Sequence, residues 1–157
     1  MGTKRVGLAR MEAMIENLKR DLAMGAGTTL VGARKLVKTS TNAAPLTLTA
    51  LDSGACVVMS GTAHTVTLPA PTAGVEYTIT ANGTAQYQIH TAGTNVIHGH
   101  MIHSGGANTV AIVSVVDAGK VISNATSAKG DTYHLWSDGT NWYLEACVDR
   151  APSAGTH

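Results

Sequence analysis

The chain has 157 residues, of which 44% are hydrophobic, only 13% are charged and none is Phe, and its formal net charge is +1. This composition holds too little charge and too many β-branched residues for a disordered protein, and it contains no run of about 18 apolar residues that would span a membrane as a helix. The length suits one ordinary domain with an appendage rather than two domains.

Charge is unevenly distributed along the chain. Residues 1–40 carry eight Lys or Arg against three acidic residues, a net charge of +5, whereas the remainder carries three against seven, a net charge of −4. A basic segment on an acidic body suggests that the segment touches an acidic partner, which can be nucleic acid, another protein or a neighbouring subunit. A helix that is simply solvated would explain the same charges.

Residues 1–24 are predicted to form an N-terminal helix. Its apolar residues recur at steps of three and four, the spacing of a coiled-coil seam, and a helix of this length is marginal in water without a partner. The segment lacks the long apolar core of a secretory signal, so export by that route is not expected. The residues that we expect to bind a partner or another subunit are Arg5, Leu8, Arg10, Met11, Ile15, Leu18, Lys19, Arg20 and Leu22.

The rest of the chain is predicted to be mainly β. Residues 25–43 contain three glycines without a clear period and are expected to form an extended arm or linker. Residues 44–150 are expected to form a β-sandwich or jelly-roll-like domain, because short alternating segments recur about every 8–12 residues between turn residues. Residues 151–157 are expected to be a flexible tail. The predicted strands are 45–50, 55–59, 64–68, 75–80, 86–90, a buried strand at 110–116, and a hairpin of 132–136 and 142–148 around Asp138-Gly139.

The predicted β-domain carries very little charge over its first part. Between residues 44 and 119 only Asp52, Glu76 and Asp117 are charged. A monomeric sandwich usually protects its sheet edges with charge, especially Lys. The neutral surface therefore predicts that copies of the chain pack together, although Thr-rich surfaces can also be soluble alone.

His98, His100 and His103 lie in one short segment, residues 97–104. If this segment is a strand, His98 and His100 point to the same face and could share a divalent metal ion. If Gly99 and the following glycines break the strand, the segment is a polar loop. The segment contains no acidic residue and one chain offers no third ligand of convincing spacing, so no metal and no cofactor are expected.

The sequence predicts no catalytic residues and no enzyme. The chain has no Gly-x-Ser-x-Gly nucleophile motif, and its glycine-rich stretches lack the lysine and spacing of a phosphate-binding loop. Its acidic residues are scattered rather than paired as in a glycosidase. The basic segment lacks interleaved aromatic residues, so nucleic acid is not an expected partner.

Trp136, Trp142 and Tyr143 cluster around the predicted hairpin. Because Trp136 and Trp142 are six residues apart across the turn, they are expected to lie near-opposite on one face, as core packing. On an exposed tip the three aromatic residues could instead bind a glycan.

Cys56 and Cys147 each lie in an apolar stretch and are expected to be buried thiols, with a single bridge between them left open.

Several segments resemble virion structural proteins of tailed bacteriophages. Residues 131–144 read DTYHLWSDGTNWYL and resemble the terminal hairpin that closes a β-domain in phage fibre, spike and decoration proteins. Residues 48–54 (LTALDSG), 64–74 (HTVTLPAPTAG) and 77–79 (YTI) resemble two early strands of the same group. Residues 1–10 (MGTKRVGLAR) and 15–20 (IENLKR) look like small virion proteins of aquatic phages, including cyanophages. Together these segments cover about a third of the chain.

The resemblance implies a homotrimer without catalysis, assembled in the host cytoplasm and carried on the virion. Because the chain is short for a fibre and shows no shaft repeats, it fits a capsid decoration (cement) protein better, with the N-terminal residues named above gripping the major capsid protein on the capsid surface. The alternative is a fibre or spike with a receptor- or glycan-binding tip formed by Trp136, Trp142 and Tyr143. Related fibre trimers can hold iron through His-x-His pairs, which His98 and His100 match once.

Overall fold

The computed structural model describes residues 10–13, 15, 35–104, 110–123, 128–149 and 153–155. The chain divides into two units, residues 1–34 and 35–157. Of the first unit, residues 10–13 and 15 are α-helical and exposed, and the rest of the predicted helix lies outside the described residues. None of the described helical segments has the length and apolar character needed to cross a membrane.

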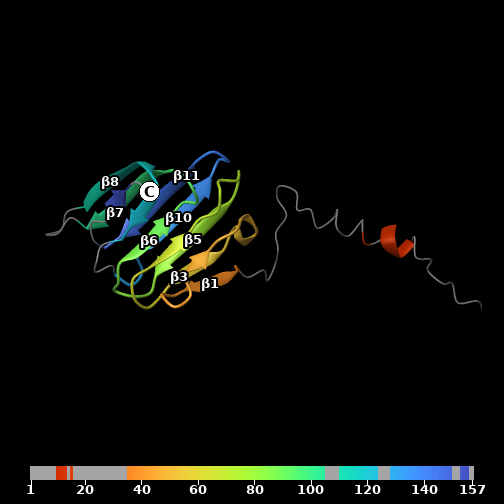
Figure 1. Ribbon diagram of the computed structural model, residues 1–157, viewed down its shortest axis with the longest axis horizontal. Coiled ribbons are helices and arrows are strands. Elements are labelled where there is room, and N and C mark those ends of the chain that lie inside the picture. The colour runs from red at the N-terminus through yellow and green to blue at the C-terminus, as the bar shows by residue number, and fades with distance from the viewer. Residues whose placement is uncertain are drawn as a thin grey trace, which may run out of the picture. The chain divides into compact units, whose positions relative to one another are not determined.

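The second unit consists of β-strands arranged in two sheets, so the prediction of a mainly β protein is confirmed. The seven-stranded sheet has the order β1-β3-β5-β10-β11-β7-β8, which can be followed across Figure 1, and the five-stranded sheet has the order β12-β9-β6-β4-β2. The strands are β1 (Val37–Ser40), β2 (Leu46–Thr47), β3 (Cys56–Met59), β4 (His64–Thr67), β5 (Glu76–Ala81), β6 (Tyr87–His90), β7 (Ile97–Ser104), β8 (Val110–Ala118), β9 (Lys120–Ile122), β10 (Thr132–Ser137), β11 (Trp142–Val148) and β12 (Ser153–Gly155), with one 3-10 turn, η1 (Ala50–Asp52), before β3.

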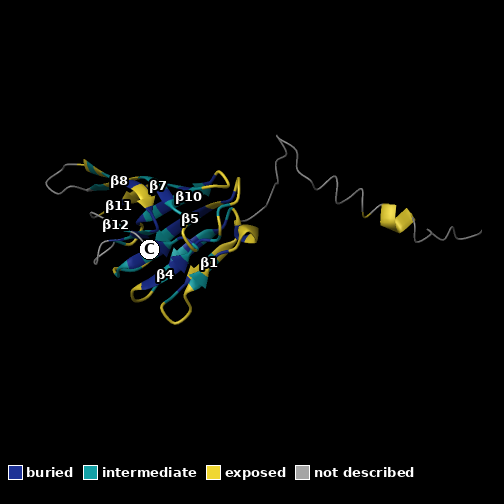
Figure 2. Ribbon diagram, turned by 45° about the horizontal axis from the view of Figure 1, so that its top comes forward, coloured by how far each residue is buried: buried dark blue, intermediate teal, exposed yellow. Residues whose placement is uncertain are grey.

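Both sheets contribute to one hydrophobic core. Alternate residues of their strands are buried, such as Tyr77 and Ile79 in β5 and Val66 in β4, and Figure 2 shows this alternation along the ribbons. The bulkiest core side chain is Trp142, whose indole N–H donates to the carbonyl of Pro69 at 3.1 Å and whose ring lies 5.6 Å from that of Tyr77. Each sheet therefore has one face in the core and one face directed away from it.

The first six strands wind alternately between the two sheets. Strands β1, β3 and β5 join the seven-stranded sheet, while β2, β4 and β6 join the five-stranded sheet, and neighbours within each set are parallel. Val37 pairs with Cys56, 19 residues later, and Val66 pairs with Ile89, 23 residues later. Parallel pairing of this kind differs from the antiparallel pairing that is usual in β-sandwiches and jelly rolls. The alternating sequence pattern reports which face is buried and not which strand lies alongside.

Two segments that were assigned outside the β-domain form strands within it. Residues 37–40, placed in the extended arm, form β1 and pair with β3. Residues 153–155, placed in the flexible tail, form β12 and pair with β9. In both cases a sheet edge supplies hydrogen-bond partners to a segment whose own side chains show no strand pattern.

The predicted terminal hairpin is confirmed. Strands β10 and β11 pair in register through Ser137 and Trp142 and leave a four-residue turn, in which Gly139 has a φ of +99° that an L side chain rarely adopts. The side chain of Asp138 organises this turn by accepting the backbone N–H groups of Thr140 and Asn141.

Strand β7 runs straight through the histidine segment, so the loop alternative for residues 97–104 is wrong. Gly99 makes this possible, because it has a φ of +146° at a register shift between β7 and β8. A Cβ at this position would lie 2.8 Å from the carbonyl carbon of Leu144 and 2.9 Å from its nitrogen. Only glycine lets β7 approach β11 this closely.

Candidate functional site

The outer face of the seven-stranded sheet, which is the face directed away from the core, carries a group of histidine, aromatic and acidic side chains. Along β10 and β11 the apolar residues are buried, so the intervening polar and aromatic residues lie on this face. Register then aligns them across neighbouring strands. One row consists of Glu76, Trp136, Tyr143 and His98, and the next of Thr78, His134, Glu145 and His100.

Four of these side chains form a continuous series of rings, which we call the ring row: His134, Trp136, Tyr143 and His98. The rings of Trp136 and Tyr143 are stacked, with centroids 5.9 Å apart and planes 22° from parallel. The ring of His134 lies 5.5 Å from that of Trp136, and the ring of His98 lies 6.1 Å from that of Tyr143. The ring row thus crosses three strands, β10, β11 and β7.

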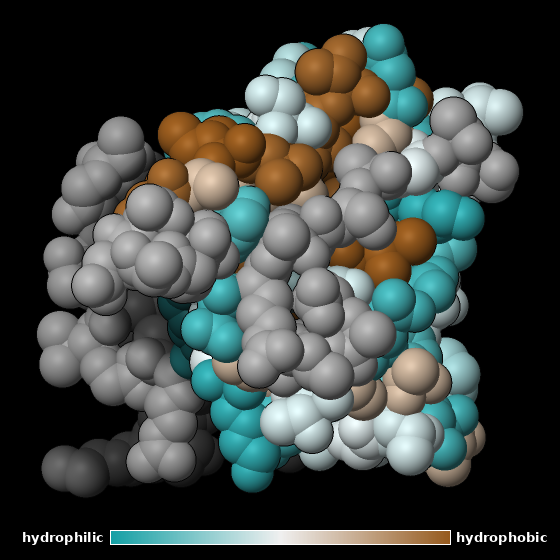
Figure 3. Space-filling view, turned by 90° about the vertical axis from the view of Figure 1, so that its left-hand side faces the viewer, coloured by the Kyte–Doolittle hydropathy of each residue, from teal (hydrophilic) through white to brown (hydrophobic). Residues whose placement is uncertain are grey.

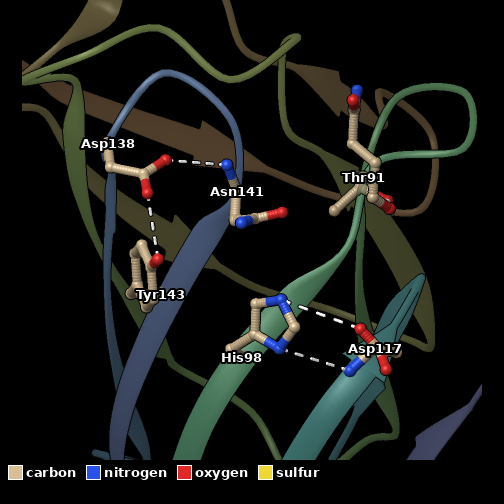
Figure 4. Close-up of polar contacts among 7 residues, drawn as sticks. Thr91, His98, Asp117, Asp138, Asn141 and Tyr143 are labelled. Carbon is tan, nitrogen blue, oxygen red and sulfur yellow. Dashed lines mark hydrogen bonds and ion pairs between the residues drawn. The ribbon is translucent and has the colours of Figure 1, made fainter.

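The hydroxyl of Tyr143 is held in place by the hairpin turn. It donates to Oδ2 of Asp138 at 2.9 Å, and Oδ1 of Asp138 accepts the backbone N–H of Asn141 at 2.8 Å (Figure 4). Oδ1 of Asp138 also accepts the backbone N–H of Thr140 at 2.7 Å. The N–H groups of Asn141 and Thr140, followed by the Tyr143 hydroxyl, hold the pKa of the Asp138 carboxyl below its usual range. Asp138 is therefore a fixed negative charge beside the ring row.

Carboxylates also stand at both ends of the ring row. His98 Nε2 lies 3.8 Å from Oδ1 of Asp117, whose backbone N–H donates to His98 Nδ1 at 3.4 Å (Figure 4). At the other end, His134 Nε2 lies 3.8 Å from Oε2 of Glu76. The strands β5, β10, β11, β7 and β8 contain no Lys or Arg, so the charged or titratable side chains that they contribute to this face are carboxylates and imidazoles.

Beside the ring row the outer face is hollowed into two adjoining grooves. The first has a volume of about 400 Å³ and is lined by polar side chains, among them His100, Thr132, His134 and Glu145. The second has a volume of about 710 Å³ and is lined by apolar residues and by His103, Lys129, Asp131 and Asp149. The two grooves share Ile102 and Cys147.

Strand β8 lies at the edge of the seven-stranded sheet and is not the buried strand that its apolar sequence predicts. Val110, Ile112 and Val116 are 73%, 66% and 70% exposed, and Ile102, directly opposite Ile112 on β7, is 40% exposed. We call these four residues the β8 apolar edge. Exposed surface on β8 is visible in Figure 2, and Figure 3 shows apolar side chains gathered on this side of the molecule. A run of Val and Ile has the same sequence pattern whether its own core or a neighbouring molecule covers it.

The predicted N-terminal contact residues are only partly described. Arg10, Met11 and Ile15 lie in helical residues and are exposed, with Met11 at 47% and Ile15 at 54%. The other predicted contacts, Arg5, Leu8, Leu18, Lys19, Arg20 and Leu22, lie outside the described residues.

The aromatic residues of the hairpin do not form the predicted pair. Trp142 is completely buried and pairs with Ser137, whereas Trp136 pairs with Tyr143 on the outer face. The four-residue turn offsets the two tryptophans by one position, and one position in a strand changes the face. Trp142 is a core residue and cannot touch a glycan, whereas Trp136 and Tyr143 remain accessible.

The histidines and cysteines also have defined positions. His98 and His100 share the outer face, as expected for a strand, and across the described residues no group of three His, Cys, Asp or Glu side chains is placed to hold a metal ion. Both cysteines are free thiols, but the expectation that both are buried is wrong, because Cys147 is exposed. Cys147 lies on the outer face, where an apolar neighbour in sequence does not imply burial.

His134 and the carboxylates of Glu76, Asp117, Asp138 and Glu145 belong to this site but were not predicted as site residues. The signal for His134 was present, because His134 and Trp136 are two residues apart in a predicted strand and must share a face. Glu76 was not detectable in this way, since its position opposite Trp136 depends on the pairing of β5 with β10, which is not local.

Compared with known proteins, the chain matches no family model and no curated sequence.

Proposed function

We propose that this protein is a non-enzymatic structural component of a tailed-phage virion, a capsid decoration protein that assembles as a homotrimer on the shell and stabilises it. The observation that carries the proposal is the β8 apolar edge, four exposed Val and Ile residues at the edge of the seven-stranded sheet. The sequence resemblance of the 131–144 hairpin and of the 64–74 segment to phage virion proteins directs the proposal to a phage particle.

The β8 apolar edge has the features of a surface that is covered by a partner. Strand β8 is nine residues long and contains no Pro, Lys or Arg, the residues that usually prevent edge-to-edge association. Burying Val110, Ile112 and Val116 would contribute roughly 1–2 kcal/mol for each side chain. A second copy of the same chain is the simplest partner, because its own exposed Val and Ile residues would be buried in the same contact.

The low charge of the β-domain supports the proposed assembly of several copies of the chain. Of its few acidic residues, Asp52 is buried and paired with Lys38, whose Nζ lies 2.6 Å from Oδ1 of Asp52. The exposed surface between residues 44 and 119 is therefore even less charged than the sequence alone suggests. We further assign the two facing sheets to the sandwich class, a compact body of the kind that can sit over a junction between capsid subunits.

The N-terminal segment supplies the second part of the proposal, the grip on the shell. Arg10, Met11 and Ile15 are exposed, and together they combine positive charge with apolar surface, the chemistry needed to dock on an acidic protein surface. Three such segments tied together in a trimer would act at high effective concentration, so weak individual contacts suffice.

Labelling of intact virions tests the proposal. An antibody against the purified chain should decorate the heads of the phage that encodes it, and a chain lacking residues 1–24 should show reduced occupancy when added to undecorated heads. Labelling of the tail alone would contradict the decoration role. Unchanged occupancy of the truncated chain would remove the N-terminal segment from the mechanism.

A further inference from the structure

The chain uses its few large aromatic residues in two distinct ways. It contains two Trp and four Tyr residues, and the structure describes all six. Trp142, Tyr77, Tyr87 and Tyr133 are at most 1% exposed and fill the core. The remaining two, Trp136 and Tyr143, lie together on the outer face, stacked against each other in the ring row.

We propose that the ring row is a carbohydrate-binding surface that takes an uncharged polysaccharide. The exposed parts of the Trp136 and Tyr143 rings offer apolar, polarisable contact of the kind that the C–H groups of a sugar ring require. Two further rings, His134 and His98, extend this contact across three strands, so the surface is long enough for more than one sugar unit.

The polar groups around the rings match the hydroxyls of a sugar. Carboxylate oxygens of Glu76, Asp117 and Asp138 accept hydrogen bonds, and imidazoles can either donate or accept them. The Asp138 carboxylate is held by backbone N–H groups and by the Tyr143 hydroxyl, so its position is set before a ligand arrives. A few fixed polar groups beside an apolar platform are the usual construction of a small-molecule binding site.

The adjoining polar groove continues this surface. His134 belongs both to the ring row and to the lining of the groove of about 400 Å³, which also contains His100, Glu145 and Thr132. A sugar chain that contacts Trp136 therefore meets further hydrogen-bonding side chains along β7, β10 and β11.

The charge of the face distinguishes a neutral sugar from the other ligands that stack on aromatic rings. Proteins that bind single-stranded nucleic acid combine stacking with a positively charged groove that follows the phosphates. Here the strands β5, β10, β11, β7 and β8 carry no Lys or Arg. Four carboxylates lie near the rings, those of Glu76, Asp117, Asp138 and Glu145. Phosphate and sulfate groups would be repelled by this face, whereas an uncharged polysaccharide would not.

The ring row shares no residue with the β8 apolar edge, and only Ile102 belongs both to that edge and to the polar groove beside the ring row. A cross-strand aromatic pair also stabilises a sheet by about 0.2–1 kcal/mol. A purely structural role for Trp136 and Tyr143 is therefore the competing explanation, and a binding experiment separates the two.

The test is native affinity electrophoresis of the full chain in gels that contain dextran, galactomannan or hydroxyethyl cellulose as neutral probes, and heparin as an anionic probe. At least one neutral polysaccharide should retard the chain, and heparin should not. Trp136→Ala should abolish the retardation, with a loss in affinity of tenfold or more. Thr65→Ala, on the other sheet, should leave the retardation unchanged.

A second readout uses Trp136 as its own reporter. In the Trp142→Phe variant, Trp136 is the sole tryptophan, and its fluorescence should change on addition of the polysaccharide that retards the chain. Tyr143→Phe keeps the stacked ring but removes the bond to Asp138, so it should weaken binding less than Trp136→Ala. Absence of retardation by all three neutral probes, equal retardation of the wild-type chain and Trp136→Ala, or retardation by heparin alone would overturn the proposal.

Discussion

Replacement of Gly99 by alanine tests the geometry on which the outer face of the seven-stranded sheet depends. The added Cβ would lie 2.8 Å from the carbonyl carbon and 2.9 Å from the nitrogen of Leu144, and these backbone atoms cannot rotate away as a side chain can. The φ of +146° adds backbone strain of about 1–3 kcal/mol, and overpacking costs a further 1–3 kcal/mol or so. Gly99→Ala should therefore lower the free energy of unfolding by about 2–6 kcal/mol.

Urea unfolding followed by tryptophan fluorescence measures this loss, because the buried Trp142 reports on the core next to β11. Gly93→Ala is the matched control, since Gly93 also has a positive φ, +61°, but a Cβ there would meet nothing within 4 Å. The control should lose only about 1–2 kcal/mol, the cost of the left-handed backbone alone. If Gly99→Ala costs no more than Gly93→Ala, the close approach of β7 to β11 is incorrect.

Three further outcomes follow from the described contacts. Trp142→Ala should lower the free energy of unfolding by about 3–5 kcal/mol because Trp142 is completely buried, whereas Trp136→Ala should cost less than about 1 kcal/mol; equal losses in urea unfolding would contradict this division. The hydrogen-bonded ion pair with Lys38, followed by the N–H of Thr49, lowers the pKa of Asp52 in the folded protein. The ionised Asp52 therefore contributes to the free energy of unfolding above the usual carboxyl pKa of 3.8, and this contribution is lost as the pH falls through the lower folded-state pKa. Asp52→Asn should therefore cost about 1–3 kcal/mol at pH 7 and flatten the decline of stability below pH 4, and an unchanged acid limb would refute the linkage. Cys147 should react with a maleimide in the folded protein faster than Cys56, because Cys147 is exposed and Cys56 is half-buried, and mass spectrometry of the labelled peptides would show a reversed order if the placement is wrong.

The parts of the fold that depend on short-range signals were predictable from the sequence. Asp138-Gly139 predicts the turn of the β10–β11 hairpin because the conformation of the turn requires those residue types locally. The alternation around Tyr77 and Ile79 likewise predicts a strand with one buried face. In each case the physical cause lies within a few residues of the signal.

The parts that depend on pairing between distant strands were not predictable. The parallel pairing of Val37 with Cys56 leaves no trace in the local pattern. The exposure of Ile112 depends on the position of β8 at the edge of the sheet. An apolar run in the sequence does not indicate whether the protein's own core or another molecule covers it. The division of Trp136 and Trp142 between outer face and core follows from a turn of four residues, so an error of one residue in register moves a side chain from one face to the other.

The same limitation applied to the candidate site. Trp136 and Tyr143 were recognisable as an aromatic cluster from their nearness in sequence. The rest of the ring row and its carboxylates come from β5, β7 and β8, and only the sheet brings them together. Surfaces that cross several strands have no sequence motif of their own.

Sedimentation equilibrium of the full chain in dilute solution tests the central claim, that the β8 apolar edge is covered by other copies of this protein. The wild-type chain should sediment as a trimer, and Ile112→Lys should shift it towards the monomer because a charge then enters the covered surface. Thr65→Lys, which adds the same charge to the other sheet, should leave the trimer intact. A wild-type chain that remains monomeric at micromolar concentration, or an Ile112→Lys variant that sediments as the wild type does, would contradict the account.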